Sequence, residues 1–565
     1  MKDIVLKYVL KNAFDFRGKA NSKVVLGAVL RENSALKSDV PALLKEIEKT
    51  IKDVEKMTLA EVEMKLGKIN PTLLMEQKEE KMEGPLKELL NAVMGKVVVR
   101  IAPSPSGPLH IGHAYGTSLN YEYAKMYKGK LILRIEDTNA ENIYPQAYEL
   151  IERDVKWMTE EGVVQVFVQS SRLGEYYDAA EKLVNKGNAY VCECDADEWR
   201  EKKNKGIACS CRELSVKENQ LRYAKMFNAY AEGEAVLRLK TDIKDKNPAM
   251  RDLAIMRIVE HVHPKTGKEH RVWPLMIFSV AVDDHEMGVT HVLNGKDHVD
   301  NGEKERMIMK MLGWETPEYK HWGRINFEGF ELSTSKIRLA IERKEYEGWE
   351  DIRLPFMPAL RRRGYQAGAF RRFAIETGLS LNDKTVGIEE FWKMLNAFNK
   401  ELIDLKANRY FFVDNPVKIK IEKGLSKEIS LDCHPEDPKR GKRKFKAKGE
   451  VYVTAQDYEC LDVKKLHRLM DYCNFVIEKG KWKFVSERYE EYKDSDKRGS
   501  IIHWVPVGEE VKVEVLNLDN KLVKGFGEKD LSKAKVGDIV QLERRYFARV
   551  DEKTKDVIRL WYLHS

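Results

Sequence analysis

Residues 100–114 read Arg100-Ile-Ala-Pro-Ser104-Pro-Ser-Gly107-Pro-Leu-His110-Ile-Gly112-His113-Ala. The β-branched residues up to Ile101 predict a strand, and the apolar spacing from Leu109 to about Tyr127 predicts a helix. A second strand is expected at Leu131–Ile135, which completes a β-α-β unit of a parallel sheet. At the carboxyl end of such a strand, a loop lets a ligand come close while the helix N-terminus offers N–H groups to phosphate. The stretch therefore predicts a nucleotide-binding site.

Two histidines stand where the predicted helix begins. His110 and His113 can donate hydrogen bonds there, and Gly107 and Gly112 leave room for a ligand. Such imidazoles can stabilise charge that builds on an α-phosphate under attack by a carboxylate, which is an electrostatic role. Taken alone, two histidines at a helix start more often cap or pack that helix.

A second polar block, Arg134-Ile-Glu136-Asp137-Thr138-Asn139, ends the second predicted strand and reaches the same sheet edge as the histidines. Its carboxylates can hold an ammonium group, and a simple Asx turn is the alternative.

A third block, Glu331-Leu-Ser333-Thr334-Ser335-Lys336-Ile-Arg338, follows shortly after Gly329. The Lys336 ammonium suits the β- and γ-phosphates as pyrophosphate leaves and a loop closes. Taken alone, this block is typical of an ordinary surface loop.

The three blocks occur together and in order, and they resemble the signatures of class I aminoacyl-tRNA synthetases. Residues 100–114 are similar to the HIGH region of the glutamyl and glutaminyl enzymes, and residues 134–138 are similar to their Arg-x-Glu/Asp-Asp-Thr block. Residues 332–336 look like the KMSKS variant of archaeal and eukaryotic-type glutamyl enzymes. The resemblance covers nearly the whole chain, through blocks at residues 247–252, 282–290, 404–412 and 501–504.

The resemblance implies a reaction and a set of site residues. The reaction is ATP-dependent formation of a glutamyl-adenylate, with Mg2+, followed by transfer of glutamate to the terminal adenosine of its tRNA. The family commonly needs bound tRNA for the first step, and the position of Glu136 binds the α-amino group. The implied residues are, for catalysis, His110, His113 and Lys336; for ATP, Pro103, Ser104, Gly112, Ser333, Ser335 and Lys336; and for the amino acid, Arg100, Ser104, Glu136, Met276 and Asn294.

With 565 residues, the chain is too long for a single core, and a multidomain α/β plus all-β fold is expected. Residues 1–95 are expected to be helical, including a helix at Leu86–Met94 that Gly95 ends. The remaining expected divisions are a Rossmann-like catalytic domain at 96–325 with an acceptor-end insertion at about 188–270, a KMSKS-like loop and helical stem-contact domain at 326–412, and anticodon-binding β-barrels at 413–565.

Composition argues against a membrane protein, because 34% of the residues are charged and no apolar run approaches the ~18 residues that span a bilayer. The N-terminus lacks a secretory signal, so the cytoplasm is expected, and the resemblance implies a monomer. Basic residues cluster at Arg361-Arg362-Arg363, at Arg371-Arg372 and at residues 439–448. These clusters suit phosphate backbones, or they are solvated surfaces.

Four cysteines form two pairs, Cys192-x-Cys194 and Cys209-x-Cys211, with fourteen residues between the pairs. Four soft ligands from one loop suit tetrahedral zinc, and reduced buried thiols are the alternative. Similar Cys-rich knots occur in the acceptor-end insertion of some glutamyl enzymes, where the metal is structural.

The expected amino-acid pocket departs from the family pattern. Met276 stands where a strand of the family carries a tyrosine that frames the substrate, and Ile277 replaces a polar residue. Asn294 replaces an arginine that is credited with meeting the γ-carboxylate. A buried carboxylate without a cationic partner is costly, so Arg100 is left for that role, and glutamine or another polar amino acid is an alternative substrate.

An alternative from a different functional class is a tRNA-binding protein that derives from a synthetase and does not activate an amino acid. The presence of His110, His113 and Lys336 argues against it, because a non-catalytic descendant has no physical need for all three. A small adenylyltransferase would not need a platform of basic helices and barrels that matches a tRNA in size.

Overall fold

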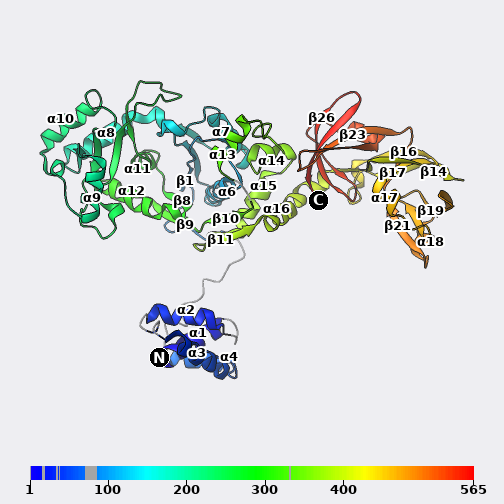
Figure 1. The fold of residues 1–565 in the computed structure, drawn as a ribbon, viewed down its shortest axis with the longest axis horizontal. Coiled ribbons are helices and arrows are strands. Elements are labelled where there is room, and N and C mark those ends of the chain that lie inside the picture. Colours follow the sequence, from blue (N-terminus) through cyan, green and yellow to red (C-terminus); the bar gives the residue numbers. More distant parts are fainter. Residues whose placement is uncertain (1, 16–19, 34–35, 37–38, 70–85, 330–331) are drawn as a thin grey trace. The chain divides into compact units, whose positions relative to one another are not determined.

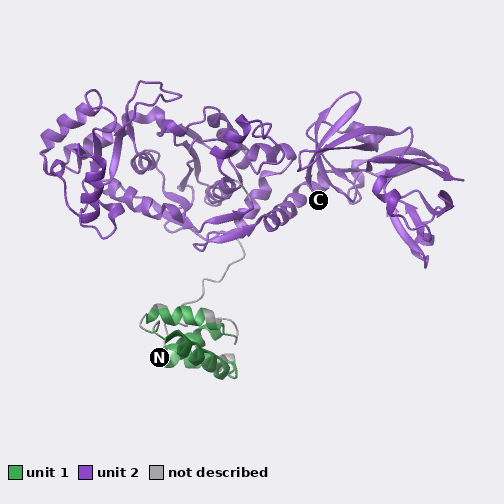
Figure 2. Cartoon of the chain, in the orientation of Figure 1, with its two compact units in different colours: residues 1–85 green, residues 86–565 purple. Residues whose placement is uncertain are grey.

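The chain folds as two compact units. A computed structural model describes residues 2–15, 20–33, 36, 39–69, 86–329 and 332–565, so Glu331 of the third block lies outside the described residues. The first unit spans Met1–Pro85 and the second spans Leu86–Ser565 (Figure 2). Among the described residues, no helix combines the length and the apolar character that crossing a membrane requires.

The first unit is helical, as its sequence predicts. Its helices are α1 (Lys2–Asp15), α2 (Ser22–Glu32), α3 (Val40–Val54) and α4 (Leu59–Ile69) (Figure 1). Along α3 the buried residues Leu43, Ile47, Ile51 and Val54 recur every three or four positions, so one face of the helix enters the core of the unit. The Asp39 carboxylate caps α3 by accepting a hydrogen bond from the Ala42 N–H at 3.1 Å.

The helix predicted at residues 86–94 is wrong, because this segment forms turns. The Ala92 N–H donates to the Leu89 carbonyl at 3.4 Å in a turn, and other backbone groups of the segment bond to neighbouring elements. The Leu89 N–H donates to the Tyr127 hydroxyl at 2.8 Å, and the Leu90 carbonyl lies 2.9 Å from Nε2 of His291. Tertiary hydrogen bonds therefore override the helical spacing of the apolar residues.

The second unit is built on a parallel sheet, which confirms the predicted β-α-β unit and Rossmann-like fold. The Thr290 N–H donates to the Val98 carbonyl at 3.0 Å and so places β8 beside β1. The carboxyl ends of β1, β2 and β8 meet at one edge, where the candidate site lies. These elements are β1 (Val98–Ile101), α6 (Ile111–Met126), β2 (Lys130–Ile135), α7 (Ala147–Met158), β3 (Gln165–Val168), β8 (His291–Gly295) and β9 (Glu318–Trp322).

An antiparallel sheet, ordered β4-β5-β6-β7, lies between β3 and β8 in the chain. Met276 and Ile277 start helix α11 and not a strand, because β7 ends at Pro274 and the next N–H groups fold back onto the Leu275 carbonyl. The elements of this region are α8 (Leu173–Asn185), β4 (Ala189–Cys192), α9 (Ala196–Lys205), α10 (Val216–Met226), β5 (Val236–Leu239), β6 (Ala254–Ile258), β7 (Val272–Pro274) and α11 (Met276–Glu286) (Figure 1). Helix α12 (Val299–Leu312) follows β8.

A largely helical region includes the third polar block, and its helix α15 packs on α6 and α16. The region comprises β10 (Ile325–Glu328), α13 (Thr334–Glu342), α14 (Met357–Arg363), α15 (Ala367–Thr377), β11 (Lys384–Gly387) and α16 (Ile388–Ile403). The arginine clusters bind protein groups here. Arg363 is buried and donates to the Leu563 carbonyl at 2.7 Å, and Arg362 pairs with Asp551 at 2.8 Å. Phosphate binding is therefore a wrong prediction for Arg363.

The C-terminal part consists mainly of β-strands, as predicted, and also contains the short helices α17 (Ala455–Cys460) and α18 (Tyr489–Lys493) (Figure 1). One seven-stranded sheet has β12 and β13 at its opposite edges, yet only Phe411 separates these strands in the chain. The two edges must therefore meet, and the sheet is rolled into a barrel. A second seven-stranded sheet has β21 and β22 at its edges and closes in the same way.

The strands of the first barrel are β12 (Asn408–Tyr410), β13 (Phe412–Asp414), β23 (Glu510–Leu516), β24 (Leu522–Glu528), β25 (Ile539–Leu542), β26 (Tyr546–Lys553) and β27 (Val557–His564). Those of the second are β14 (Pro416–Glu422), β17 (Glu450–Thr454), β18 (Leu466–Leu469), β19 (Cys473–Glu478), β20 (Lys481–Ser486), β21 (Arg498–Ile502) and β22 (Val505–Pro506). The basic run lies on a hairpin of β15 (Ser426–Asp432) and β16 (Lys442–Lys448), where exposed lysines alternate with buried residues.

Candidate active site

The two histidines form the start of α6. Nδ1 of His110 accepts a hydrogen bond from the Gly112 N–H at 3.0 Å, and Nδ1 of His113 accepts one from the His110 N–H at 3.3 Å. Since both Nδ1 atoms are acceptors, each neutral imidazole carries its proton on Nε2. The two histidines therefore do cap the helix, as one interpretation of the sequence predicts. Capping uses only the Nδ1 atom of each ring, so each Nε2–H can still donate to a ligand.

Both imidazoles are neutral at physiological pH. Burial, followed by the influence of His113, lowers the pKa of His110 to about 2. Burial lowers the pKa of His113 to about 4, although part of that residue remains exposed. The pair can therefore stabilise a phosphate by hydrogen-bond donation and not as a fixed cation.

The third polar block packs directly on the loop of the first. A Cβ added at Gly107 would lie 2.2 Å from Cγ2 of Thr334, so only glycine leaves space for this contact. The Ser333 hydroxyl accepts a hydrogen bond from the Lys336 N–H at 3.5 Å and caps α13, while Ser335 and Lys336 are exposed. The two blocks, far apart in sequence, are thus brought together.

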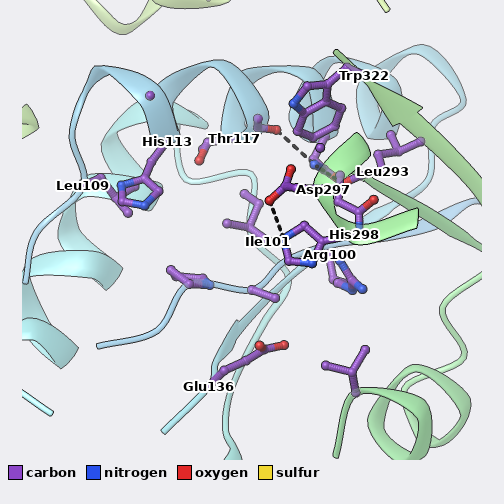
Figure 3. Close-up of a pocket in the computed structure, with 18 of the residues that line it drawn as sticks. Arg100, Ile101, Leu109, His113, Thr117, Glu136, Leu293, Asp297, His298 and Trp322 are labelled. Carbon is purple, nitrogen blue, oxygen red and sulfur yellow. Dashed lines mark hydrogen bonds and ion pairs between the residues drawn. The ribbon is translucent and has the colours of Figure 1, made fainter. Parts of the chain in front are cut away.

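A cavity of about 420 Å³ opens beside His113 (Figure 3). Of the predicted residues, the cavity is lined by Arg100, Pro103, Gly112, His113, Glu136, Met276 and Asn294. The predicted residues outside its lining are Ser104, His110, Ser333, Ser335 and Lys336. The Glu136 N–H donates to the Pro103 carbonyl at 3.0 Å, which joins the second block to the first.

A buried ion network stands beside the cavity. The Asp284 carboxylate accepts hydrogen bonds from Nε and Nη2 of Arg100 at 3.1 and 3.2 Å, and from Nη1 of Arg134 at 2.6 Å. Burial acts to raise the pKa of Asp284, but the two guanidiniums outweigh it and lower that pKa. Arg134 also donates to Oε1 of Glu136 at 3.0 Å. The network therefore fixes both Arg100 and Glu136 in position.

Arg100 keeps donors for a ligand. A guanidinium has five N–H groups, and Asp284 occupies two of them, so three are left. Glu136 gives Oε1 to Arg134, and burial raises its pKa against the opposing charge of Arg134. The cavity can therefore offer charged donors and a carboxylate to a zwitterionic ligand.

Asn294 is held by a histidine on the neighbouring strand. Asn294 and His321 are directly paired between β8 and β9, and Nδ1 of His321 donates to Oδ1 of Asn294 at 2.6 Å. Burial, followed by the charge of Arg306, lowers the pKa of His321, so this ring is neutral. With Oδ1 engaged, the Asn294 NH2 group can donate into the cavity.

Sequence reasoning missed several residues of the cavity. Glu305 on α12 is 4% exposed, accepts a hydrogen bond from the Tyr319 hydroxyl at 3.0 Å, and has a pKa that burial raises to about 7. Its spacing from Ile308 and Leu312, which puts it on the apolar face of the helix, could have revealed it. Other missed lining residues are Thr117, Asn120, Asp297, His298 and Trp322 (Figure 3).

The four paired cysteines meet in one cluster. Their Sγ atoms all lie within 4.8 Å of one another. The Sγ atoms of Cys192 and Cys209 are 3.9 Å apart, as are those of Cys194 and Cys211. A zinc ion bound to four thiolates at ~2.3 Å places neighbouring sulfurs about 3.8 Å apart, so the donor set fits that metal.

The fold and the site together define a class I catalytic domain, and the chain belongs to the class I aminoacyl-tRNA synthetases of the E and Q type. Residues 96–405 match "tRNA synthetases class I (E and Q), catalytic domain", and residues 407–493 and 501–551 match the corresponding anti-codon binding domains. As a member of this class, the protein uses ATP and has tRNA as a partner.

The relatives that match this chain over its full length are named for the amino acid glutamate. The chain is 43% identical to the glutamate–tRNA ligases of Methanococcus maripaludis strain C7 and of Methanocaldococcus jannaschii, with 100% of each chain covered in both comparisons. It is 42% identical to the glutamate–tRNA ligase of Methanothermobacter thermautotrophicus, again over 100% of both chains.

Proposed function

We propose that this protein ligates glutamate to tRNA at the expense of ATP, through a glutamyl-adenylate. The observation that carries the proposal is the convergence of the histidine loop, Glu136 and the segment of Lys336 at one edge of a parallel sheet. Relatives that are named glutamate–tRNA ligases over their full length support the choice of amino acid.

In the first step, an oxygen of the amino acid's carboxylate attacks the α-phosphate of ATP while the bond to the β-phosphate oxygen breaks. The Nε2–H groups of His110 and His113 donate to the α-phosphate oxygens as negative charge builds there. The Lys336 ammonium follows the departing pyrophosphate, and Mg2+ bound with ATP would help to neutralise the charge of that leaving group. The proposed ATP-binding residues are Pro103, Ser104, Gly112, Ser333, Ser335 and Lys336.

In the amino-acid pocket, Glu136 receives the α-ammonium group, and the three unengaged N–H groups of Arg100 receive the γ-carboxylate. Asn294 adds a neutral donor that His321 holds in place, while Ser104 and Met276 complete the proposed set. Because the NH2 group of Asn294 suits a carbonyl as well as a carboxylate, glutamine is the second candidate substrate.

The second step transfers the aminoacyl group to the terminal adenosine of tRNA while the barrels read the anticodon. We propose the domain division into residues 1–95, 96–325 with its insertion at about 188–270, 326–412 and 413–565. A monomer that acts in the cytoplasm is part of the same proposal.

We infer that the cysteine cluster holds a structural zinc ion. Cys192, Cys194, Cys209 and Cys211 supply four sulfur ligands at the right spacing, and each pair lies at one end of the chain segment that includes α9. Such an ion would cross-link this part of the antiparallel region and have no role in the chemical step.

The test is amino-acid-dependent ATP consumption and tRNA charging with each of the twenty amino acids and total tRNA. Glutamate is expected to support both reactions. Charging of tRNA with glutamine and not with glutamate would show that glutamine is the substrate. Tight tRNA binding without activation of any amino acid would support the tRNA-binding alternative.

A further inference from the structure

The backbone that carries His110 is held by groups outside the substrate cavity. The Met357 N–H donates to the Leu109 carbonyl at 2.8 Å, and the Ile111 N–H donates to the Pro355 carbonyl at 3.2 Å. These bonds pair His110 with Phe356 in an antiparallel bridge. The start of α14 thus fixes one side of the histidine segment.

A buried carboxylate takes up a further backbone group of this segment. Oδ2 of Asp154, on α7, accepts a hydrogen bond from the Leu109 N–H at 3.3 Å. The Asp154 side chain is 0% exposed, and its other oxygen, Oδ1, has no hydrogen-bond partner among the described residues. The nearest cation to Oδ1 is Arg361 of α14, whose Nη1 lies 3.7 Å away. A buried carboxylate satisfied so incompletely is costly, and each unsatisfied group of this kind calls for an explanation.

The Asp154 carboxylate holds backbone that lies next to the catalytic histidines. Leu109 lines the cavity and directly precedes the N-cap residue of α6, so a shift of its backbone moves the His110 ring. A misplacement of ~1 Å at a reacting centre can cost about a hundredfold in rate.

We propose that Asp154, balanced by Arg361, is a positioning residue for adenylate formation: it anchors the Leu109 N–H and so keeps the two imidazole Nε2–H donors aligned with the α-phosphate. This inference rests on the proposed adenylate chemistry. It also gives a role to Arg361, which the sequence indicates only as part of a basic cluster.

The charged groups that face Asp154 are Arg361 from α14, Arg153 from α7 and Glu350 from the loop before α14. Burial raises the pKa of Asp154 to about 7, against the charges of Arg361 and Arg153 and the Leu109 hydrogen bond. The ionised carboxylate accepts the Leu109 N–H more strongly than the protonated one does. The rate of adenylate formation should therefore rise with pH through 7 in the wild-type enzyme.

The experiment compares wild type with Asp154→Asn, in the full chain with tRNA present, by glutamate-dependent exchange of pyrophosphate into ATP between pH 6 and 8.5. Asparagine keeps an acceptor oxygen of similar size but has no charge and does not titrate. We expect kcat at pH 8 to fall about tenfold, KM for ATP to stay within about twofold, and the rise through pH 7 to flatten. Glu152→Gln on the same helix removes an exposed charge that pairs with Lys156 at 2.7 Å, and it should leave kcat and the profile unchanged.

A purely structural role predicts a different result. If Asp154→Asn lowers the unfolding temperature while kcat per folded enzyme and the pH profile match those of wild type, the proposal is overturned. Should that variant fail to fold, Arg361→Gln serves in its place. Loss of the cation raises the pKa of Asp154, so the midpoint of the profile should move to higher pH, and an unmoved midpoint overturns the proposal.

Two controls separate this result from other effects. Glu305, whose pKa burial also raises to about 7, is present in every variant, so only the part of the profile that Asp154→Asn removes belongs to Asp154. Absence of exchange in wild type with every amino acid would overturn the proposed function itself, and this inference with it.

Discussion

The substitution Asp284→Asn removes one charge from the centre of the buried ion network without changing the size of the side chain. In the wild-type protein this carboxylate accepts hydrogen bonds at 3.1, 3.2 and 2.6 Å from Arg100 and Arg134. Asparagine offers one oxygen, and its NH2 group would face N–H donors. Removal of one partner from a buried ion pair costs about 3–5 kcal/mol, and we expect the catalytic sheet to lose that much stability.

This loss of stability can be measured in the sheet itself by hydrogen exchange of the β1 and β2 amides, followed by mass spectrometry at pH 7. Each ~1.4 kcal/mol is a factor of ten, so exchange through opening of the sheet should accelerate by roughly two to four powers of ten. The pKa of Asp284 lies below its ordinary value of 3.8. The difference in stability between wild type and Asp284→Asn is therefore at its full size at neutral pH and becomes smaller as the pH falls below 3.8.

Asp297→Asn provides the matched control. Asp297 also lines the cavity, but its side chain is 71% exposed, and its carboxylate lies 3.5 Å from Nε2 of His298. This substitution should change the opening free energy by less than about 0.5 kcal/mol. Equal exchange rates in the two variants would refute the view that the ion network holds Arg100 and Glu136 in place.

Three further predictions concern the substrate pocket and the cysteines. Asn294→Arg should lower KM for glutamate about tenfold, because an added guanidinium can pair with the γ-carboxylate, and an unchanged or higher KM would mean that this group is held elsewhere. In the wild-type enzyme, KM for glutamate should rise between pH 6 and 8, because Glu305, with a pKa of about 7, ionises and repels the substrate. In Glu305→Gln, KM for glutamate should not change over this pH range. The same pH dependence of KM in both enzymes would contradict this role of Glu305. Elemental analysis should find about one zinc per chain, lost in Cys209→Ser and kept in Cys460→Ser, whose thiol is exposed and outside the cluster; a wild-type value near zero would refute the metal site.

The parts of the fold that the sequence predicts well are those that local spacing determines. The strand, loop and helix around His110 occur where the run of β-branched residues and the helical spacing predict them. The segment at residues 86–94 has equally clear helical spacing, but its backbone bonds to Tyr127 and His291, which lie far along the chain. Local patterns do not carry this tertiary information.

The same limit applies to the candidate site. Its first and third blocks are recognisable because each is a short continuous motif, and the structure brings them into contact at Gly107. The partner of Arg100 is Asp284, from a distant part of the chain, and Asn294 depends on His321 across a strand pair. Such pairings are set by the packing of the sheet, so spacing in the sequence does not reveal them.

The proposed function is tested most directly by identifying the amino acid that the protein attaches to tRNA. The full chain would be incubated with ATP, Mg2+, total tRNA and equal concentrations of glutamate and glutamine. The aminoacyl-adenosine released from the tRNA 3′ end would then be identified by mass spectrometry. We expect glutamyl-adenosine as the main product. Glutaminyl-adenosine alone, or no aminoacyl-adenosine at all, would refute the proposed ligation of glutamate to tRNA.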